Sequence, residues 1–345
     1  MRILIVGSDL PWAIERHYVK YLRESGTETF NYPAHDFVFN YHSRNILNKI
    51  LFKTKIKTGY REVNQELLQR ATALRPDVIW IFKGMEIYPE TLGALRKMGT
   101  RLVNFNPDHP FIIISSGSGN KNVTDSVGLY DLHFCYSNSL RQEIQGRFGL
   151  PTVFLPFAYD AGDVSYISPE QITEIPRLCF QANPDAYRAR MLNLLAKSGI
   201  PVDVYGHGWD RTAIAGTKGI SIFPIASRKD FWQKNQAYRV QLNLFREYNF
   251  GSHNMRTFEI PVVGGIQLTK YSEEQEGFFE EGKEIFFFHD EEDLVYKTKA
   301  ILAMSQAEAA KIRRNARQRS LTSGYSFADR AKTVFETFQQ MTGHD

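Results

Sequence analysis

The sequence predicts an α/β protein with two doubly wound parallel sheets, one in each half of the chain. Short apolar runs alternate with segments of helical periodicity, which is the pattern of βαβ units. Runs such as 2–8 and 77–82 are apolar at nearly every position, which is typical of strands buried on both faces. A polar, turn-rich segment, 158–176, separates the two series, and 345 residues suffice for two domains.

The first half alternates regularly between the two kinds of element. After strand 2–8, Ile14, Tyr18 and Leu22 recur at helical spacing, and Gly26 ends that helix. The further strands expected here are 77–82, 101–105, 131–137 and 152–156, and the further helices are 63–74, 92–99 and 138–149.

The second half repeats the pattern after the linker. We expect strands at 177–181, 202–206, 219–223, 238–245, 265–269 and 284–288, and helices at 187–198, 227–235, 254–260, 273–281, 291–303, 306–321 and 326–341. The predicted domains are an N-terminal domain at 1–160, a linker at 161–176, a C-terminal domain at 177–325, and a last helix within 326–345 that packs back on the N-terminal domain.

Composition narrows the class of protein. A net charge of +4, spread along the chain, does not indicate nucleic-acid binding but suits an anionic substrate. Cys135 and Cys179 lie in apolar strand-like runs, so we expect buried free thiols in a reducing compartment. Because no signal-peptide pattern and no apolar run of about 18 residues is found, we expect a cytoplasmic protein.

The segment 254–269, NMRTFEIPVVGGIQLT, combines a short helix with an abrupt change to a strand. Arg256 and Glu259 are three residues apart and therefore share one helix face. We expect Pro261 to stop the helix, and the Gly-Gly pair to turn the chain into a buried strand.

A nucleotide-binding role would explain this helix. A cation in the first turn opposes the helix dipole, so Arg256 fits best if an anion binds in front of it. The Glu259 carboxylate, one turn further on, is suited to the two hydroxyls of a ribose. Ser252 or Asn254 is placed to cap the helix. The alternative is an exposed ion pair on an ordinary helix.

The order of several motifs resembles the GT-B glycosyltransferases. NMRTFEIPVVGGIQLT is followed by EEGKEIFFFHDEEDLVYKTKAIL and YSFADR, as in their C-terminal domain, and VDVYGHGW and NFNPDHPF lie upstream. The chain is most similar to the CgeB-like spore-maturation group, beside glycosyltransferase families 1 and 4, over about residues 75–335. The resemblance implies two Rossmann-type domains facing across a cleft, with no cofactor and a nucleotide diphosphate sugar as donor.

The resemblance also implies roles for residues of the second domain. Glu259 would bind the donor ribose and Arg256 its diphosphate. The family 4 pattern places a second glutamate eight residues before the ribose-binding one, where this chain has Gly251. The retaining stereochemistry that accompanies that glutamate is therefore open here.

Two loops of the second domain supply further donor contacts by resemblance. Arg188 and Arg190 follow its first strand and would approach the donor phosphates, unless they lie on a solvated helix face. In YGHGW, Gly206 allows close backbone approach, and His207 or Trp209 would border the base. The alternative for Trp209 is a place in the core.

The acceptor side is expected in the first domain. NPDHPF follows strand 101–105, so its side chains lie at the edge of the sheet where ligands gather. Asp108 is the expected general base, and His109 a base or a donor to the sugar, although Asp108 is also suited to capping a loop. Asp9 is a second choice for the base, with Trp12 against the acceptor.

The segment 44–61 interleaves basic and apolar residues. Such a helix lies on an anionic membrane or guides an anionic acceptor, or else packs in the core with a solvated basic face. No metal-ligand spacing occurs in the sequence, and the acidic 290–293 is expected to begin a helix.

The expected function is metal-independent transfer of a sugar from a nucleotide diphosphate sugar to an acceptor, with Arg256 offsetting the charge of the leaving diphosphate. Two alternatives stay open: a nucleotide-sugar epimerase or hydrolase of the same fold, and a non-catalytic nucleotide-sugar-binding module. The sequence names neither the donor sugar nor the acceptor.

Overall fold

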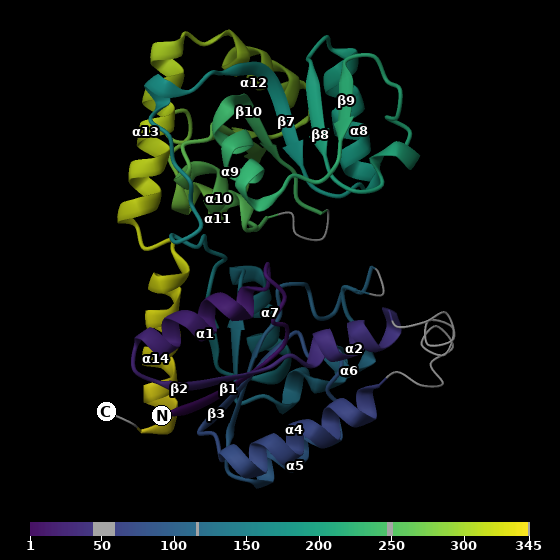
Figure 1. Ribbon diagram of the computed structural model, residues 1–345, viewed down its shortest axis with the longest axis vertical. Helices are drawn as coiled ribbons and strands as arrows, with labels where there is room; N and C mark the ends of the chain where they lie inside the picture. Colours follow the sequence, from purple (N-terminus) through teal and green to yellow (C-terminus); the bar gives the residue numbers. More distant parts are fainter. Residues whose placement is uncertain (44–58, 115–116, 247–250, 344–345) are drawn as a thin grey trace. The chain divides into compact units, whose positions relative to one another are not determined.

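The computed structural model describes residues 1–43, 59–114, 117–246 and 251–343 (Figure 1). The chain forms two compact units. Met1–Pro156 and Phe327–Asp345 make up the first unit, and Phe157–Ser326 makes up the second. The segment 161–176, expected as a linker, thus lies within the second unit.

The first unit is built on a six-stranded parallel sheet in the order β2-β1-β3-β4-β5-β6. Its strands are β1 (Arg2–Val6), β2 (Glu28–Tyr32), β3 (Val78–Phe82), β4 (Arg101–Phe105), β5 (Leu132–Cys135) and β6 (Thr152–Phe154). Its described helices are α1 (Ile14–Glu24), α2 (Ala34–Ser43), α4 (Tyr60–Leu74), α5 (Pro89–Lys97), α6 (Lys121–Ser126), α7 (Asn138–Phe148) and α14 (Phe327–Thr342).

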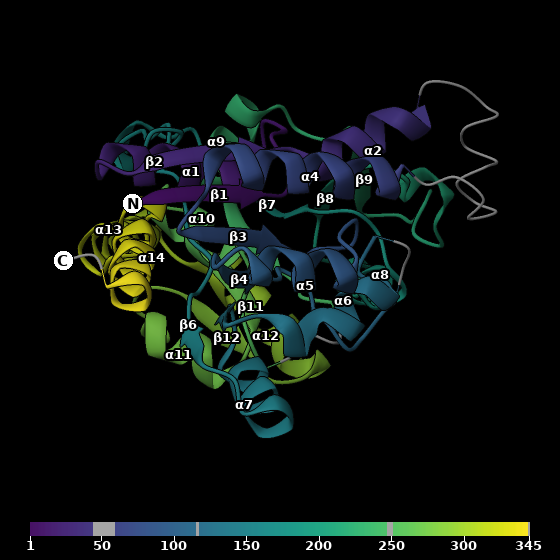
Figure 2. The same cartoon turned by 90° about the horizontal axis from the view of Figure 1, so that it is seen from below.

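Alternating side chains of β3 pack against helices on both faces of this sheet. Ile79 and Ile81 belong to a core cluster with residues of α4 and α5, and Figure 2 looks onto this face, with α4 and α5 in front of the strands. Trp80 points the other way, with its ring centroid 4.8 Å from that of Tyr18 and 5.6 Å from that of Phe338. Helix α14 therefore completes the core of the first unit beside α1 (Figure 1).

The second unit has its own parallel sheet, in the order β12-β11-β10-β7-β8-β9. Its strands are β7 (Ile175–Gln181), β8 (Val202–Tyr205), β9 (Ile220–Phe223), β10 (Tyr238–Asn243), β11 (Gln267–Lys270) and β12 (Phe286–Phe288). Its described helices are α8 (Ala186–Lys197), α9 (Arg228–Ala237), α10 (Arg256–Val262), α11 (Glu273–Phe278), α12 (Glu291–Ala303) and α13 (Gln306–Thr322). Leucines, isoleucines and valines of α8 and α12 cover one face of this sheet.

The predicted fold class is confirmed, with two parallel α/β sheets of six strands each. Strand β2 and helix α2 were not predicted. β2 lies at the edge of its sheet and has the sequence ETFNY, so it carries neither a continuous apolar run nor a clean alternation. The prediction that Pro261 stops a helix is wrong by one residue, because α10 continues to Val262.

Both cysteines are buried free thiols, as predicted, and burial raises the pKa of the Cys135 thiol to about 12. No helix among the described residues has the length and apolar character needed to cross a membrane.

Candidate functional site

The loop before α10 is held by side-chain hydrogen bonds. The Asn254 side chain accepts a hydrogen bond from the Thr257 backbone N–H at 3.1 Å and so holds the start of α10, although Met255 is the residue at the N-cap position. It also exchanges hydrogen bonds with Asn243, at the end of β10. Ser252, the other expected cap, instead donates to Glu274 at 2.9 Å and is buried.

His253 lies between these two residues and was not singled out in the sequence. It is fully buried, and its Nε2 accepts the Phe157 backbone N–H at 3.2 Å. The proton therefore sits on Nδ1, which lies 2.9 Å from a carboxylate oxygen of Glu274. His253 thus ties the start of the second unit to the loop that leads into α10.

The predicted pair of Arg256 and Glu259 forms, and it is not an exposed surface pair. Arg256 Nη1 donates to Glu259 Oε2, and the Glu259 side chain is only 3% exposed. The Arg256 guanidinium also lies over the Phe231 ring, 4.3 Å from its centroid. Within the described part of the chain, the second carboxylate oxygen, Oε1, has no hydrogen-bond partner, and the buried Arg256 Nε also has none.

The Gly-Gly pair after α10 is required by the packing. Gly264 has a φ of 78°, which lies in the left-handed region. A Cβ on Gly265 would lie 2.7 Å from the Asn235 carbonyl oxygen and 2.7 Å from a methyl group of Ile260. The chain can therefore turn sharply from α10 into β11 only without side chains here.

The two arginines expected at the donor phosphates are held differently. Arg188 is buried, with Nη2 donating to the Leu244 carbonyl at 3.0 Å and Nη1 to the Asn183 carbonyl at 2.9 Å. Arg190 is mostly exposed and forms an ion pair with Glu291 at 2.7 Å. Arg188 thus connects the loops after β7 and β10, whereas Arg190 lies on the solvent face of α8.

In the YGHGW loop, Trp209 is buried and His207 is exposed. Trp209 is fully buried and donates from Nε1 to the Ala182 carbonyl at 2.7 Å. Its ring packs in the core, so the expectation that it borders a base gives way to the alternative of a core residue. A Cβ on Gly206 would lie 2.4 Å from the Ala182 carbonyl oxygen, so only a glycine lets the backbone at 206 come this close to the backbone at 182. His207 is exposed and donates its backbone N–H to Asn183.

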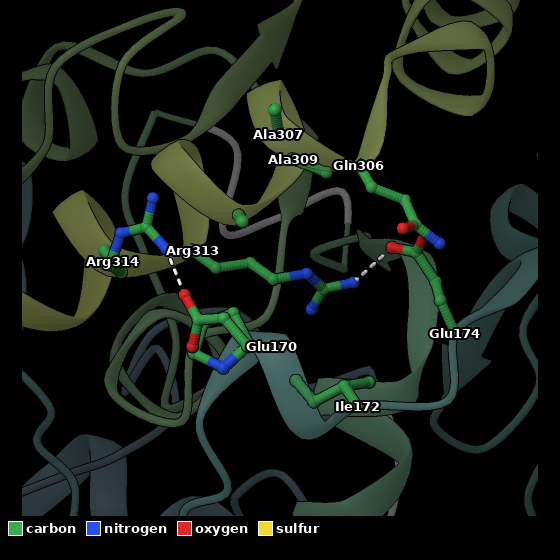
Figure 3. Close-up of a pocket in the computed structure, with 10 residues that line it drawn as sticks. Glu170, Ile172, Glu174, Gln306, Ala307, Ala309, Arg313 and Arg314 are labelled. Carbon is green, nitrogen blue, oxygen red and sulfur yellow. Dashed lines mark hydrogen bonds and ion pairs between the residues drawn. The ribbon is translucent and has the colours of Figure 1, made fainter.

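Two pockets lie in the second unit. One, of about 620 Å³, is lined by Arg190 and other residues at the start of α8 and in the turn at 212–214. The other, of about 440 Å³, lies between segment 169–174 and α13 (Figure 3). In it, Arg313 bonds Glu174 at 2.8 Å and Arg314 bonds Glu170. Neither pocket is lined by Arg256 or Glu259.

In the first unit, Asp108 and His109 follow β4 as expected, and both have protein partners. Asp108 forms an ion pair with Lys83 Nζ at 2.6 Å. His109 Nε2 lies 3.2 Å from Glu143, and its Nδ1 accepts the Phe111 backbone N–H. Burial lowers the pKa of His109, although the carboxylate of Glu143 opposes that effect. Their assignment to catalysis stays a prediction.

Lys83 is a residue that sequence reasoning missed. It directly follows β3 and has a φ of 57°, an uncommon conformation for a residue with a side chain. Its ammonium group bonds the Gly117 carbonyl at 2.6 Å as well as Asp108.

The backbone carbonyl of Asp9 accepts a hydrogen bond from Arg16, and the Trp12 side chain is 67% exposed. Of the basic segment 44–61, residues 44–58 lie outside the described part of the chain, so its three alternatives stay predictions.

Part of the sequence matches a known family, and the fold resembles those of solved structures. Residues 188–336 match a family model described as glycosyl transferase-like. Sucrose-phosphate synthase from Thermosynechococcus elongatus has a similar structure, with a TM-score of 0.71 at 10% identity and full coverage of both chains. The Anabaena protein Alr3699/HepE, solved with UDP and glucose, has a TM-score of 0.67 at 12% identity, covering 99% of this chain and 100% of that chain.

A third similar structure is that of a predicted UDP-N-acetylglucosamine 2-epimerase from Listeria monocytogenes. Its TM-score is 0.63 at 12% identity, covering 100% of this chain and 97% of that chain. No curated protein matches the sequence. The fold is GT-B. Within this GT-B chain, the glycosyl transferase-like match includes α10 with Arg256 and Glu259.

Proposed function

We propose that this GT-B protein transfers a sugar from a nucleotide diphosphate sugar to a hydroxyl group of an acceptor. The observation that carries the proposal is the glycosyl transferase-like match over 188–336, which contains the half-buried pair of Arg256 and Glu259. Related folds solved with UDP, glucose or UDP-glucose support a nucleotide-sugar donor.

In this proposal Glu259 binds the ribose of the nucleotide and Arg256 binds its diphosphate. Glu259 Oε1, which has no partner in the described chain, accepts hydrogen bonds from the ribose hydroxyls. Arg256 keeps guanidinium donors beyond its bond to Glu259 and directs them to the diphosphate. The diphosphate gains charge as the glycosidic bond breaks, so its bonds to Arg256 strengthen in the transition state without requiring a divalent metal.

The first experiment measures binding of UDP, GDP and dTDP by calorimetry to the wild type and to Glu259→Ala. Losing hydrogen bonds to a charged acceptor costs about 1.5–3 kcal/mol each, so we expect affinity for the preferred nucleotide to fall by roughly 10- to 100-fold. Glu292→Ala, an exposed acid in the first turn of α12, serves as the matched control. Unchanged affinity of the Glu259 variant for all three nucleotides would refute the ribose contact.

The second experiment follows turnover. Arg256→Ala is expected to lower kcat more than nucleotide affinity, because its bonds to the diphosphate strengthen as the leaving group departs. A loss confined to affinity makes Arg256 a binding residue only.

The same assays separate the two other functions. Isomerised sugar formed from the donor alone identifies an epimerase. Tight nucleotide-sugar binding with no release of nucleoside diphosphate identifies a binding module.

A further inference from the structure

A second histidine–carboxylate pair lies in the first unit, at residues that sequence analysis did not select. His35 is in the first turn of α2, and its backbone N–H donates to the Gly7 carbonyl at 2.9 Å, directly after β1. Glu86 lies in the loop after β3 and is 6% exposed. His35 Nδ1 and Glu86 Oε1 are 2.8 Å apart, although 51 residues separate them in sequence. The pair therefore lies at the carboxyl ends of the strands, where His35 follows β2 and Glu86 follows β3, on either side of β1.

The loop behind His35 holds Glu86 in place. The Asn64 side chain donates to the Glu86 carbonyl at 2.8 Å and accepts the Tyr88 backbone N–H at 2.9 Å. A buried carboxylate accepts a hydrogen bond but donates none when ionised, so the proton between the two side chains belongs to His35 Nδ1. That leaves the lone pair on Nε2, and the His35 side chain is 49% exposed. In the described chain, Nε2 has no hydrogen-bond partner.

The charged groups around His35 are committed to other bonds. Asp36 accepts from the Ser8 hydroxyl at 2.6 Å and from the Asp9 backbone at 2.7 Å. Glu15 accepts the Ser8 backbone N–H at 2.9 Å. Lys83 is paired with Asp108. The bond to Glu86 raises the pKa of His35, while burial and Lys83 oppose that rise.

The other acceptor-side candidates are less suited to removing a proton. The Asp108 carboxylate is already engaged in an ion pair with the Lys83 ammonium group at 2.6 Å. Both ring nitrogens of His109 have partners, and its side chain is only 14% exposed. His35 combines a half-exposed side chain, whose Nε2 has no hydrogen-bond partner among the described residues, with a buried carboxylate that orients the ring, which is the arrangement of an activated histidine base.

We infer that His35 is the general base that takes the proton of the acceptor hydroxyl, and that Glu86 is its positioning residue. This inference rests on the proposed function. As the acceptor oxygen forms its bond to the anomeric carbon, its proton moves to His35 Nε2. The bond from that carbon to the diphosphate oxygen breaks, and its electron pair leaves with the nucleoside diphosphate. Glu86 stabilises the imidazolium that forms.

The test follows release of nucleoside diphosphate from UDP-glucose, GDP-glucose and dTDP-glucose, with water and with glucose as acceptors. His35→Gln is expected to lower turnover at least 100-fold while leaving the affinity for UDP unchanged. His289→Gln, an exposed histidine of the second unit, is the control and keeps wild-type turnover. Circular dichroism confirms that each variant is folded.

A pH profile separates positioning from a merely structural role for Glu86. Wild-type turnover rises with pH as His35 loses its proton. In Glu86→Gln the neutral amide no longer favours the imidazolium, so the midpoint of that rise moves to lower pH and the plateau falls. An unmoved midpoint in Glu86→Gln overturns the positioning role.

Wild-type turnover in His35→Gln overturns the inference and leaves the proposed function standing, and a loss found in Asp108→Asn instead assigns the base to Asp108. No release by the wild type from any of the three donors overturns the proposed function and this inference with it.

Discussion

Replacing Glu15 with glutamine is expected to stabilise the first unit at neutral and alkaline pH. Glu15 lies in the first turn of α1, and its carboxylate reaches under the turn that follows β1. A Cβ on Gly7 would lie 2.3 Å from Glu15 Oε1, so the carboxylate occupies the space that the glycine leaves. Burial raises the pKa of Glu15 to about 7, against an ordinary value of 4.5, although hydrogen bonds from the backbone oppose the rise.

The sign and size of the effect follow from these values. The folded protein binds this proton more tightly than the unfolded chain, so the free energy of unfolding falls as pH rises from about 4.5 to about 7. A carboxyl group that titrates near 7 instead of 4.5 costs up to about 3 kcal/mol once it is ionised. Glutamine cannot ionise, and its carbonyl still accepts the Ser8 N–H.

The assay is urea unfolding followed by tryptophan fluorescence at pH 4.5, 6 and 8, in which the buried Trp80 reports on the first unit. The Glu15→Gln variant and the wild type should differ little at pH 4.5, whereas the variant should gain up to about 3 kcal/mol at pH 8. Glu24→Gln, exposed at the end of the same helix, is the matched control. A stability difference that stays constant from pH 4.5 to 8 would refute the reasoning.

Two further changes test the packing of the second unit. Glu174→Gln should lower the free energy of unfolding by about 3–5 kcal/mol in urea titrations, because the nearly buried guanidiniums of Arg239 and Arg313 lose their shared carboxylate. Glu170→Gln, which removes only an exposed pair with Arg314, should leave the unfolding midpoint nearly unchanged, and equal effects of the two variants would contradict this. Gly206→Ala should lower the free energy of unfolding by about 1–3 kcal/mol and lower the melting temperature, because its Cβ would collide with the Ala182 carbonyl. An unaltered melting temperature would show that the loop can shift to make room for the methyl group.

The sequence alone was sufficient to predict the fold class and most elements of the sheets. Continuous apolar runs mark strands covered on both faces, and helical spacing marks the helices between them, so these features are local. The pairing of Arg256 with Glu259 and the hydrogen bond from Thr257 to the Asn254 side chain were predictable for the same reason, since both partners lie within one helical turn.

Tertiary structure decided what depends on residues far apart in the chain. The pair of His35 and Glu86 joins residues that no local pattern connects, because they meet only after β1 has paired with both β2 and β3. The same holds for Arg188, whose guanidinium donates to a carbonyl 56 residues away. It also holds for Trp209, which belongs to a loop but is packed in the core. A sequence pattern shows that a side chain is apolar or charged, but its neighbours across the sheet determine whether it is buried, paired or left with a free lone pair.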